Sequence, residues 1–75
     1  MQSQTIEPGL YRHYKGRFYS VLNTVMHTET GETMVLYYDF AFPENGWYVR
    51  PYSMWFDQVG VDEAGQPITR FTRCE

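Results

Sequence analysis

Short stretches rich in Val, Thr and aromatic residues alternate with turn-forming residues along most of the chain. The β-rich stretches are 9–14, 18–27, 33–42, 47–50, 56–61 and 68–73. The segments between them are rich in Gly, Pro, Asn and Asp, which tight turns favour. Gly16 and Gly31 stand where hairpin turns need a left-handed backbone. This spacing predicts an all-β domain of about five or six short antiparallel strands.

The stretch 33–42 alternates with a period of two. Its even positions are all apolar or aromatic, whereas its odd positions include Thr33 and Asp39. Because successive side chains of a strand point to opposite faces, the even face is expected to line the core. The stretch 18–27 has apolar residues in both registers, which leaves its inner face undecided and is compatible with a β-bulge near Asn23.

One segment in the second half narrows the architecture. The extended run 47–50 is followed by Pro51, which cannot donate to a sheet, and 52–55 is long enough for one 3₁₀ turn. This order of strand, proline and single turn resembles the end of SH3-like barrels. We therefore expect a small SH3-like barrel over residues 9–73. Residues 1–8 are expected to form a flexible N-terminal segment.

The composition indicates how so short a chain fills a core. It has 75 residues, among them seven Tyr, five Phe and two Trp. A domain of this size buries only about 60% of the surface that its unfolded chain exposes, and each ring hides roughly 150–250 Å². The rings expected in the core by strand position are Phe18, Tyr38, Phe40, Phe42, Phe56 and Phe71.

Charge and the ends of the chain disfavour several classes of protein. The net charge is −3, whereas a module that binds duplex nucleic acid normally has a basic surplus. A short single strand or a nucleotide, stacked on Tyr or Trp beside a local basic strip, is the alternative. No apolar run approaches the ~20 residues of a membrane helix, and the N-terminus lacks the pattern of a signal peptide. We expect a cytoplasmic protein with the single Cys74 as a free thiol.

Neither a metal site nor a catalytic nucleophile is predicted. The candidate metal ligands His13, His27 and Cys74 match no known spacing of a zinc site. Ser20 and Ser53 lack the Gly-x-Ser-x-Gly context of a nucleophilic serine. We accordingly expect no metal, no cofactor and no catalytic residue of these types.

Five sequence blocks follow one another across the predicted domain. They are Tyr11-Arg-His13-Tyr-Lys15-Gly16, His27-Thr28-Glu29-Thr30-Gly-Glu32, Val35-Leu-Tyr37, Tyr48-Val49-Arg50-Pro51-Tyr-Ser-Met54-Trp55 and Pro67-Ile-Thr-Arg70-Phe71. In this order the blocks resemble a bacterial family, the domain of unknown function family 1653. The chain has Tyr48 where that family has Trp, and Trp55 where it has Phe. The resemblance implies a compact, mostly β, stand-alone cytoplasmic domain, and no activity comes with it.

These blocks hold the residues with the clearest capacity to bind a ligand. The candidates are Tyr11, His13, Lys15, His27, Glu29, Tyr37, Tyr48, Arg50 and Trp55. Arg50 is the strongest of them, because a guanidinium among large rings can stack on a ring and still donate to an anion. The ordinary alternatives are a stacked structural Arg, a core His, and a Glu29 that holds its own hairpin.

Two functions are compatible with these residues. The first is a non-catalytic binding module, in which the four candidate rings form a groove whose rim carries the charged candidates. Its partner would be a peptide, another protein or a small anionic ligand, bound by a monomer or a weak dimer. The alternative is an enzyme, or an accessory domain of one, that acts on a nucleotide-like small molecule through His13, His27 and Glu29. A single small barrel can hardly enclose the roughly 300 Å³ of such a pocket, so the alternative calls for a dimer.

Overall fold

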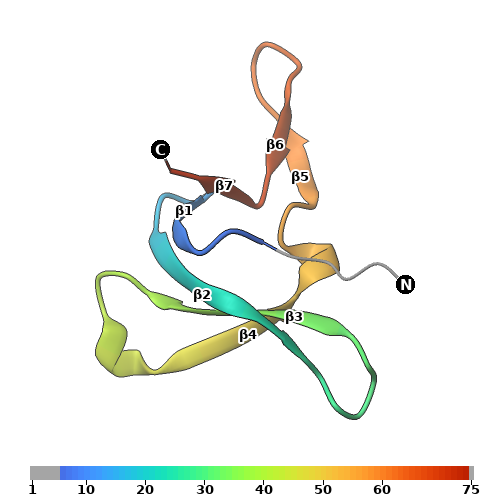
Figure 1. The fold of residues 1–75 in the computed structure, drawn as a ribbon. Coiled ribbons are helices and arrows are strands. Elements are labelled where there is room, and N and C mark those ends of the chain that lie inside the picture. The colour runs from blue at the N-terminus through green and yellow to red at the C-terminus, as the bar shows by residue number, and fades with distance from the viewer. Residues whose placement is uncertain (1–5, 75) are drawn as a thin grey trace.

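The computed structural model describes residues 6–74, which form β-strands joined by turns and two short 3₁₀ helices (Figure 1). The strands are β1 (Gly9–His13), β2 (Phe18–Met26), β3 (Thr33–Asp39), β4 (Trp47–Pro51), β5 (Gln58–Val61), β6 (Pro67–Thr69) and β7 (Phe71–Arg73). The 3₁₀ helices are η1 (Pro43–Asn45) and η2 (Tyr52–Met54). The all-β prediction is confirmed, and η2 lies where the single turn was expected.

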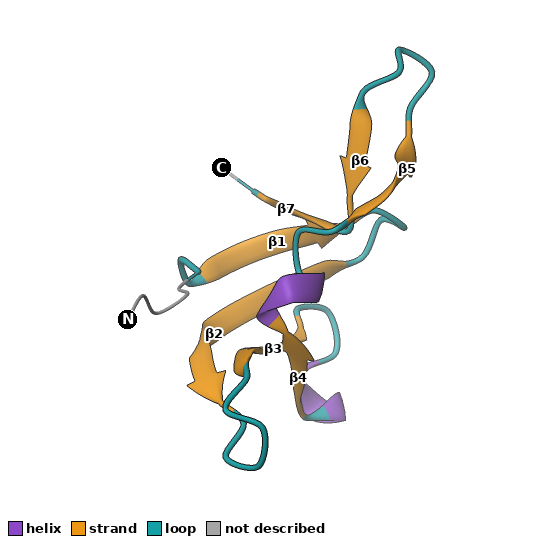
Figure 2. Ribbon diagram, turned by 90° about the vertical axis from the view of Figure 1, so that its right-hand side faces the viewer, coloured by secondary structure: helices purple, strands orange, loops and turns teal. Residues whose placement is uncertain are grey.

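Five strands form one antiparallel sheet in the order β4-β3-β2-β1-β7, and β5 pairs only with β6. The β5–β6 hairpin projects away from this sheet, as Figure 2 shows. Within residues 6–74, β4 and β7 are the edges of the sheet and do not pair with each other. The sheet is therefore open, and the expected closure into an SH3-like barrel is not observed in it.

The last predicted strand, 68–73, is divided at Arg70. The amide of Arg70 donates to the carbonyl of Asp57 at 2.9 Å, and its carbonyl accepts from the amide of Tyr14 at 2.9 Å. Because these backbone groups bond outside the strand, the chain changes sheets at this point. As a result β6 pairs with β5, whereas β7 pairs with β1, which gives seven strands instead of about six.

Two local predictions about the hairpins are confirmed. Gly31 in the β2–β3 turn has a φ of +73°, the left-handed conformation that glycine adopts without steric cost. The pairing of β2 with β3 shifts register between Val21 and Asn23, which is a β-bulge at the expected place. The bulge changes which residues of β2 share a face along the strand.

The predicted inner face of β3 is wrong. Val35, Tyr37 and Asp39 are buried, so the odd positions face the core. At the even positions Phe40 is 57% exposed, and only Met34 is buried.

Asp39 explains why the alternation pointed to the wrong face. Its carboxylate accepts from the guanidinium of Arg17 at 2.8 Å and from the amides of Ala41 and Phe42 at 3.0 and 3.3 Å. A buried polar group that is fully hydrogen-bonded is tolerated in a core. The polar residue at position 39 therefore does not identify the solvent-facing side of β3.

The core consists of rings and two valines on the inner side of the sheet. Its members are Tyr11, Val21, Val35, Tyr37, Trp55 and Phe71, with Ile6, Tyr19 and Tyr52 packed against them. Trp55 and Phe71 stack face to face, with ring centroids 3.7 Å apart and an angle of 3° between the planes. Trp55 reaches the core from the end of η2, and Phe71 reaches it from β7.

The predicted sorting of the rings into core and surface is largely reversed. Of the six rings expected in the core, Phe71 alone is fully buried, Tyr38 is half-buried, and the other four are exposed. In contrast, Tyr11, Tyr37 and Trp55, which were expected at a surface groove, are buried. The reversal follows from the inner face of β3, because Tyr37 and its neighbours across the sheet lie on that face.

Part of the expected flexible segment 1–8 lies outside the described residues. Its described end contacts the domain, since Ile6 packs against the core and the carbonyl of Glu7 accepts from the hydroxyl of Tyr11 at 2.8 Å. None of the helices in residues 6–74 has the length and apolar character to cross a membrane.

Candidate functional site

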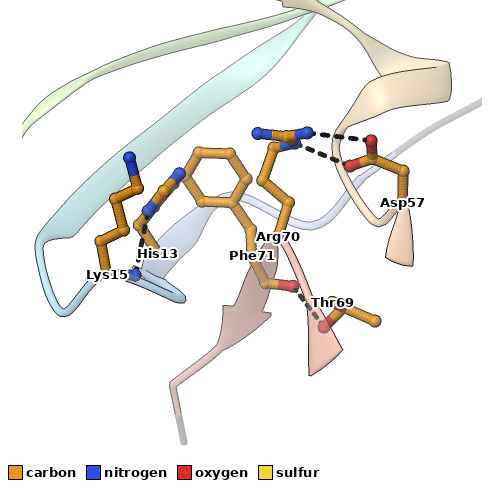
Figure 3. A network of polar contacts seen from close by, with 6 residues as sticks. All are labelled: His13, Lys15, Asp57, Thr69, Arg70 and Phe71. Atoms are coloured by element: carbon orange, nitrogen blue, oxygen red, sulfur yellow. Dashed lines mark hydrogen bonds and ion pairs between the residues drawn. The ribbon is translucent and has the colours of Figure 1, made fainter. Parts of the chain in front are cut away.

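Three predicted site residues meet around the ring of Phe71. The His13 ring contacts it edge-on at a centroid distance of 4.9 Å, and Trp55 covers one of its faces. The guanidinium carbon of Arg50 lies 5.7 Å from the Phe71 centroid. Phe71 is thus the common neighbour of a histidine, an arginine and a tryptophan, and Figure 3 shows its position beside His13.

Different elements bring these side chains together. His13 ends β1, Phe71 begins β7, and the two residues are register partners across the sheet. Arg50 pairs with buried Val35 across β4 and β3, which directs it to the inner side of the sheet. After Pro51, η2 turns the chain so that Trp55 packs on the same side, and the Trp55 amide donates to the carbonyl of Tyr52 at 3.0 Å.

Two further cations, Arg70 and Lys15, and one carboxylate, Asp57, lie near these residues. Arg70 forms a two-pronged ion pair with Asp57, with distances of 2.8 and 3.2 Å (Figure 3). Lys15 follows His13 in the β1–β2 turn, and its backbone amide donates to Nδ1 of His13 at 3.2 Å. The ammonium of Lys15 lies over the ring of Tyr14, 5.8 Å from its centroid. Three cations, Lys15, Arg50 and Arg70, thus lie close enough to affect His13, in a chain whose net charge is −3.

The charges act on the groups that titrate here. Burial lowers the pKa of His13, and the three nearby cations lower it further. The hydrogen bonds from Arg70 lower the pKa of Asp57, and Arg50 adds a smaller effect in the same direction. At neutral pH His13 is therefore uncharged, with Nδ1 as an acceptor and Nε2 as a donor.

Two nitrogen atoms at the site are buried and have no hydrogen-bond partner among the described residues. They are Nε of Arg50 and Nε1 of Trp55. The Trp55 side chain is itself fully buried, with 0% of its surface exposed. An unpaired buried N–H costs roughly 1–3 kcal/mol. Neither nitrogen is in contact with solvent, so an acceptor would reach either one only after neighbouring side chains shift.

His27 and Glu29 are not part of this group. They lie in the β2–β3 turn, at the opposite end of β2 from the β1–β2 turn that follows His13 (Figure 1). Nδ1 of His27 accepts from the amide of Glu29 at 3.2 Å, and the backbone of His27 bonds to Gly31 and Glu32. These contacts hold the hairpin through the His27 ring and backbone groups, and the side chain of Glu29, for which a role in the hairpin was weighed, takes no part in them.

The remaining candidate rings have different environments. Tyr11 and Tyr37 lie in the core, and burial raises the pKa of the Tyr11 hydroxyl. Tyr48 is 37% exposed and packs on Tyr37 at a centroid distance of 5.6 Å. With Trp55 also buried, Tyr48 is the member of the expected four-ring groove that keeps open surface. The described residues contain no cluster of three His, Cys, Asp or Glu side chains placed to hold a metal ion.

Comparison with known proteins assigns the chain to a family. A family model described as a protein of unknown function, DUF1653, matches residues 9–73. The chain belongs to the DUF1653 family. The crystal structure of a DUF1653 protein from Bordetella bronchiseptica is similar, with 34% sequence identity and a TM-score of 0.76. The match covers 92% of this chain and 87% of that one. No curated protein matches the chain.

In this DUF1653 domain the residues around Phe71 come from three of the family blocks. Arg70 and Phe71 close the last block, although neither stood among the predicted site residues. The available signal was that Arg70 and Phe71 belong to one of the five sequence blocks, as Tyr11 and His13 do. The residues next to Asp57 in the sequence give no sign of its role. Asp57 precedes the β5–β6 hairpin and Arg70 follows it, so that the two meet only once the hairpin has formed.

Proposed function

We propose that this DUF1653 domain is a non-catalytic binding module that holds an anionic group at the inner face around Phe71. The observation that carries the proposal is the pair of buried, unpaired donors on Arg50 and Trp55. A carboxylate or phosphate oxygen supplies the acceptor that such donors lack, and charged hydrogen bonds are roughly twice as strong as neutral ones.

The surrounding charges favour the same class of ligand. Arg70 already shares its guanidinium with Asp57, whereas Arg50 and Lys15 form no ion pair among the described residues. Their field attracts an anion, and the half-exposed Tyr48 in β4 adds an aromatic surface beside it. A small anionic molecule, or a peptide or protein that presents one acidic group, has the required chemistry.

The enzyme alternative receives less support from the same geometry. It relies on His13 acting together with His27 and Glu29, and those residues lie at opposite ends of β2. A single uncharged His13 beside cations provides orientation and a hydrogen bond, which a binding module also uses. The order of β4, which ends at Pro51, and η2 is compatible with the predicted SH3-like layout, and the proposed site lies next to η2.

Arg50 is the residue to change in testing this function. The probes are inorganic phosphate, a nucleoside monophosphate, a dicarboxylate and a short acidic peptide, each added during thermal unfolding. A bound anion is expected to raise the Tm of the native chain, because stability rises by RT ln(1 + [L]/Kd), about 2.7 kcal/mol at a hundredfold excess over Kd. Arg50→Ala should abolish the rise. Arg50→Lys should weaken it, since an ammonium lacks the planar fork of a guanidinium.

Arg12→Ala is the matched control. Arg12 is exposed and follows buried Tyr11 in β1, so its side chain points to the other face of the sheet. This variant should keep the response to the same probe. A native chain that responds to none of the probes, or an Arg50→Ala variant that responds like the native chain, would contradict the proposed function.

A further inference from the structure

The face of the sheet that points away from the core carries no charged side chain over β2, β3 and β4. Register partners define three rows across these strands. The rows are Ser20, Tyr38 and Trp47; Asn23, Leu36 and Val49; and Val25, Met34 and Pro51. Phe18 and Phe40 form a further row next to the first one, toward η1, where the amide of Phe40 donates to the carbonyl of Phe18 at 3.1 Å. We call this set of residues the outer face.

Much of the outer face is apolar and open to solvent. Trp47 is 67% exposed, Phe40 57% and Val49 53%. Soluble monomers rarely expose a continuous apolar patch of more than a few hundred Å². The rings of the core lie on the opposite face, and of the outer face Met34 alone is buried within the described chain.

A hollow adjoins the outer face beside η1. Its volume is about 280 Å³, and its apolar walls are Phe18, Phe40, Ala41 and Phe42. Arg17 and Asp39 close one side, where they form an ion pair of 2.8 Å. A dry cavity of roughly 150 Å³ is enough to hold a benzene ring. The hollow is therefore large enough to receive an aromatic side chain from another molecule.

We propose that the outer face is the interface of a homodimer, in which two copies meet face to face around a two-fold axis. In such an interface each residue of one copy meets the same surface patch on the other. A charged patch would oppose its own like charges across the axis, whereas the outer face carries none over its three strands. The nearest charge on this side is the exposed Arg12 of β1, the register partner of Phe18, which would lie at the rim of the interface. Two open sheets that stack in this way form a β-sandwich with a shared second core.

The exposed apolar area of the outer face is large enough for a weak contact with a second copy of the chain. A ring hides roughly 150–250 Å² when it is wholly buried. The surface still exposed on the rings of Trp47, Phe40 and Phe18, together with that of Val49 and Phe42, amounts to about 500 Å² per copy. Two copies would therefore bury about 1,000 Å² in total, which is at the low end for a specific interface and fits a weak dimer. Trp47 and the hollow lie toward the same end of the face, so that each Trp47 can enter the hollow of the other copy.

This proposal is independent of the anion site. Arg50 and Tyr48 alternate with Trp47 and Val49 along β4, so they point to the inner side of the sheet. A dimer formed through the outer face would therefore place the partner copy on the side of the sheet away from Phe71.

The mass of the protein in solution tests the dimer. Sedimentation equilibrium at about 100 μM protein, well above a micromolar Kd, is expected to give twice the 8.9 kDa of one chain. Trp47→Glu should give the mass of a single chain, because it places two carboxylates in an apolar interface. Trp47→Ala should weaken the dimer by at least about tenfold, as the loss of a central ring does in other interfaces.

Val61→Glu is the matched control. Val61 is 60% exposed, close to the 67% of Trp47, but it lies in the β5–β6 hairpin away from the outer face (Figure 2). This variant should remain a dimer, and far-ultraviolet circular dichroism should show that all variants keep the native β-structure. A native chain with the mass of a monomer, a dimeric Trp47→Glu or a monomeric Val61→Glu would each overturn the proposal.

Discussion

The two faces of the five-stranded sheet are both rich in rings, yet only one of them is covered. On the inner face, Trp55 and Phe71 stack and close over Tyr11 and Tyr37. On the outer face, Trp47 and its neighbours meet solvent. The difference arises because η2 brings Trp55 to the inner side of the sheet, where Phe71 of the edge strand β7 also points. Coverage by distant segments, and not the hydrophobicity of a strand, decides which face becomes the core.

The largest expected effect is the difference in free energy of unfolding between variants of the two tryptophans. Trp55→Ala removes the stacked ring from the centre of the core and should lower the free energy of unfolding by about 3–5 kcal/mol. Trp47→Ala, on the outer face, should change it by no more than about 0.5 kcal/mol in dilute protein, where a dimer dissociates. Urea unfolding followed by circular dichroism measures both. Equal losses in the two variants would mean that the faces do not differ as described.

A smaller effect is expected at the buried carboxylate of the inner face. Asp39→Ala leaves the amides of Ala41 and Phe42 without their acceptor and should cost roughly 1–3 kcal/mol. The matched variant Arg17→Ala should cost less than about 1 kcal/mol, because 62% of the Arg17 side chain is exposed. The same urea titration compares them. A larger loss in Arg17→Ala would show that the ion pair, and not the turn, holds Asp39 in the core.

The smallest effect concerns the pH dependence of the inner face. The pKa of His13 is lower in the folded chain than its ordinary value of 6.5, so the unfolded chain binds the proton first as the pH falls. Stability should therefore decrease below about pH 6.5 and level off once folded His13 is also protonated. The lowered pKa of Asp57 acts in a separate and more acidic range, below its ordinary 3.8.

Thermal unfolding between about pH 7 and pH 5 measures this dependence. His13→Asn removes the titrating ring and should flatten the curve of Tm against pH. A native curve that is already flat, or a variant with an unchanged slope, would show that burial and the nearby cations do not lower the pKa of His13.

Short-range features of the fold were predictable from the sequence. The turn at Gly31, the bulge beside Asn23 and the single turn after Pro51 all stand where the local pattern placed them. Such features depend on backbone preferences of a few neighbouring residues, which the sequence states directly. The break at Arg70 was missed, because the hydrogen bonds that cause it come from Asp57 and Tyr14.

The candidate site was predictable in part. His13, Lys15 and Arg50 were identified by residue type and context, and they do gather at one place. Phe71, which they surround, and Arg70 were missed as site residues. His27 was included because of its residue type, although it lies at the far end of β2. The residue type shows what a side chain can bind, but which residues lie close together depends on how the strands pair.

The sequence by itself determined that this chain is an all-β domain with more rings than its core can hide, since composition, turns and alternation are local properties. Only the tertiary structure decided which rings are hidden. Alternation in β3 distinguishes two faces but does not say which one is covered. That choice belongs to Trp55 and Phe71, which lie far along the chain, and to Asp39, whose burial depends on Arg17 and on the turn that follows it.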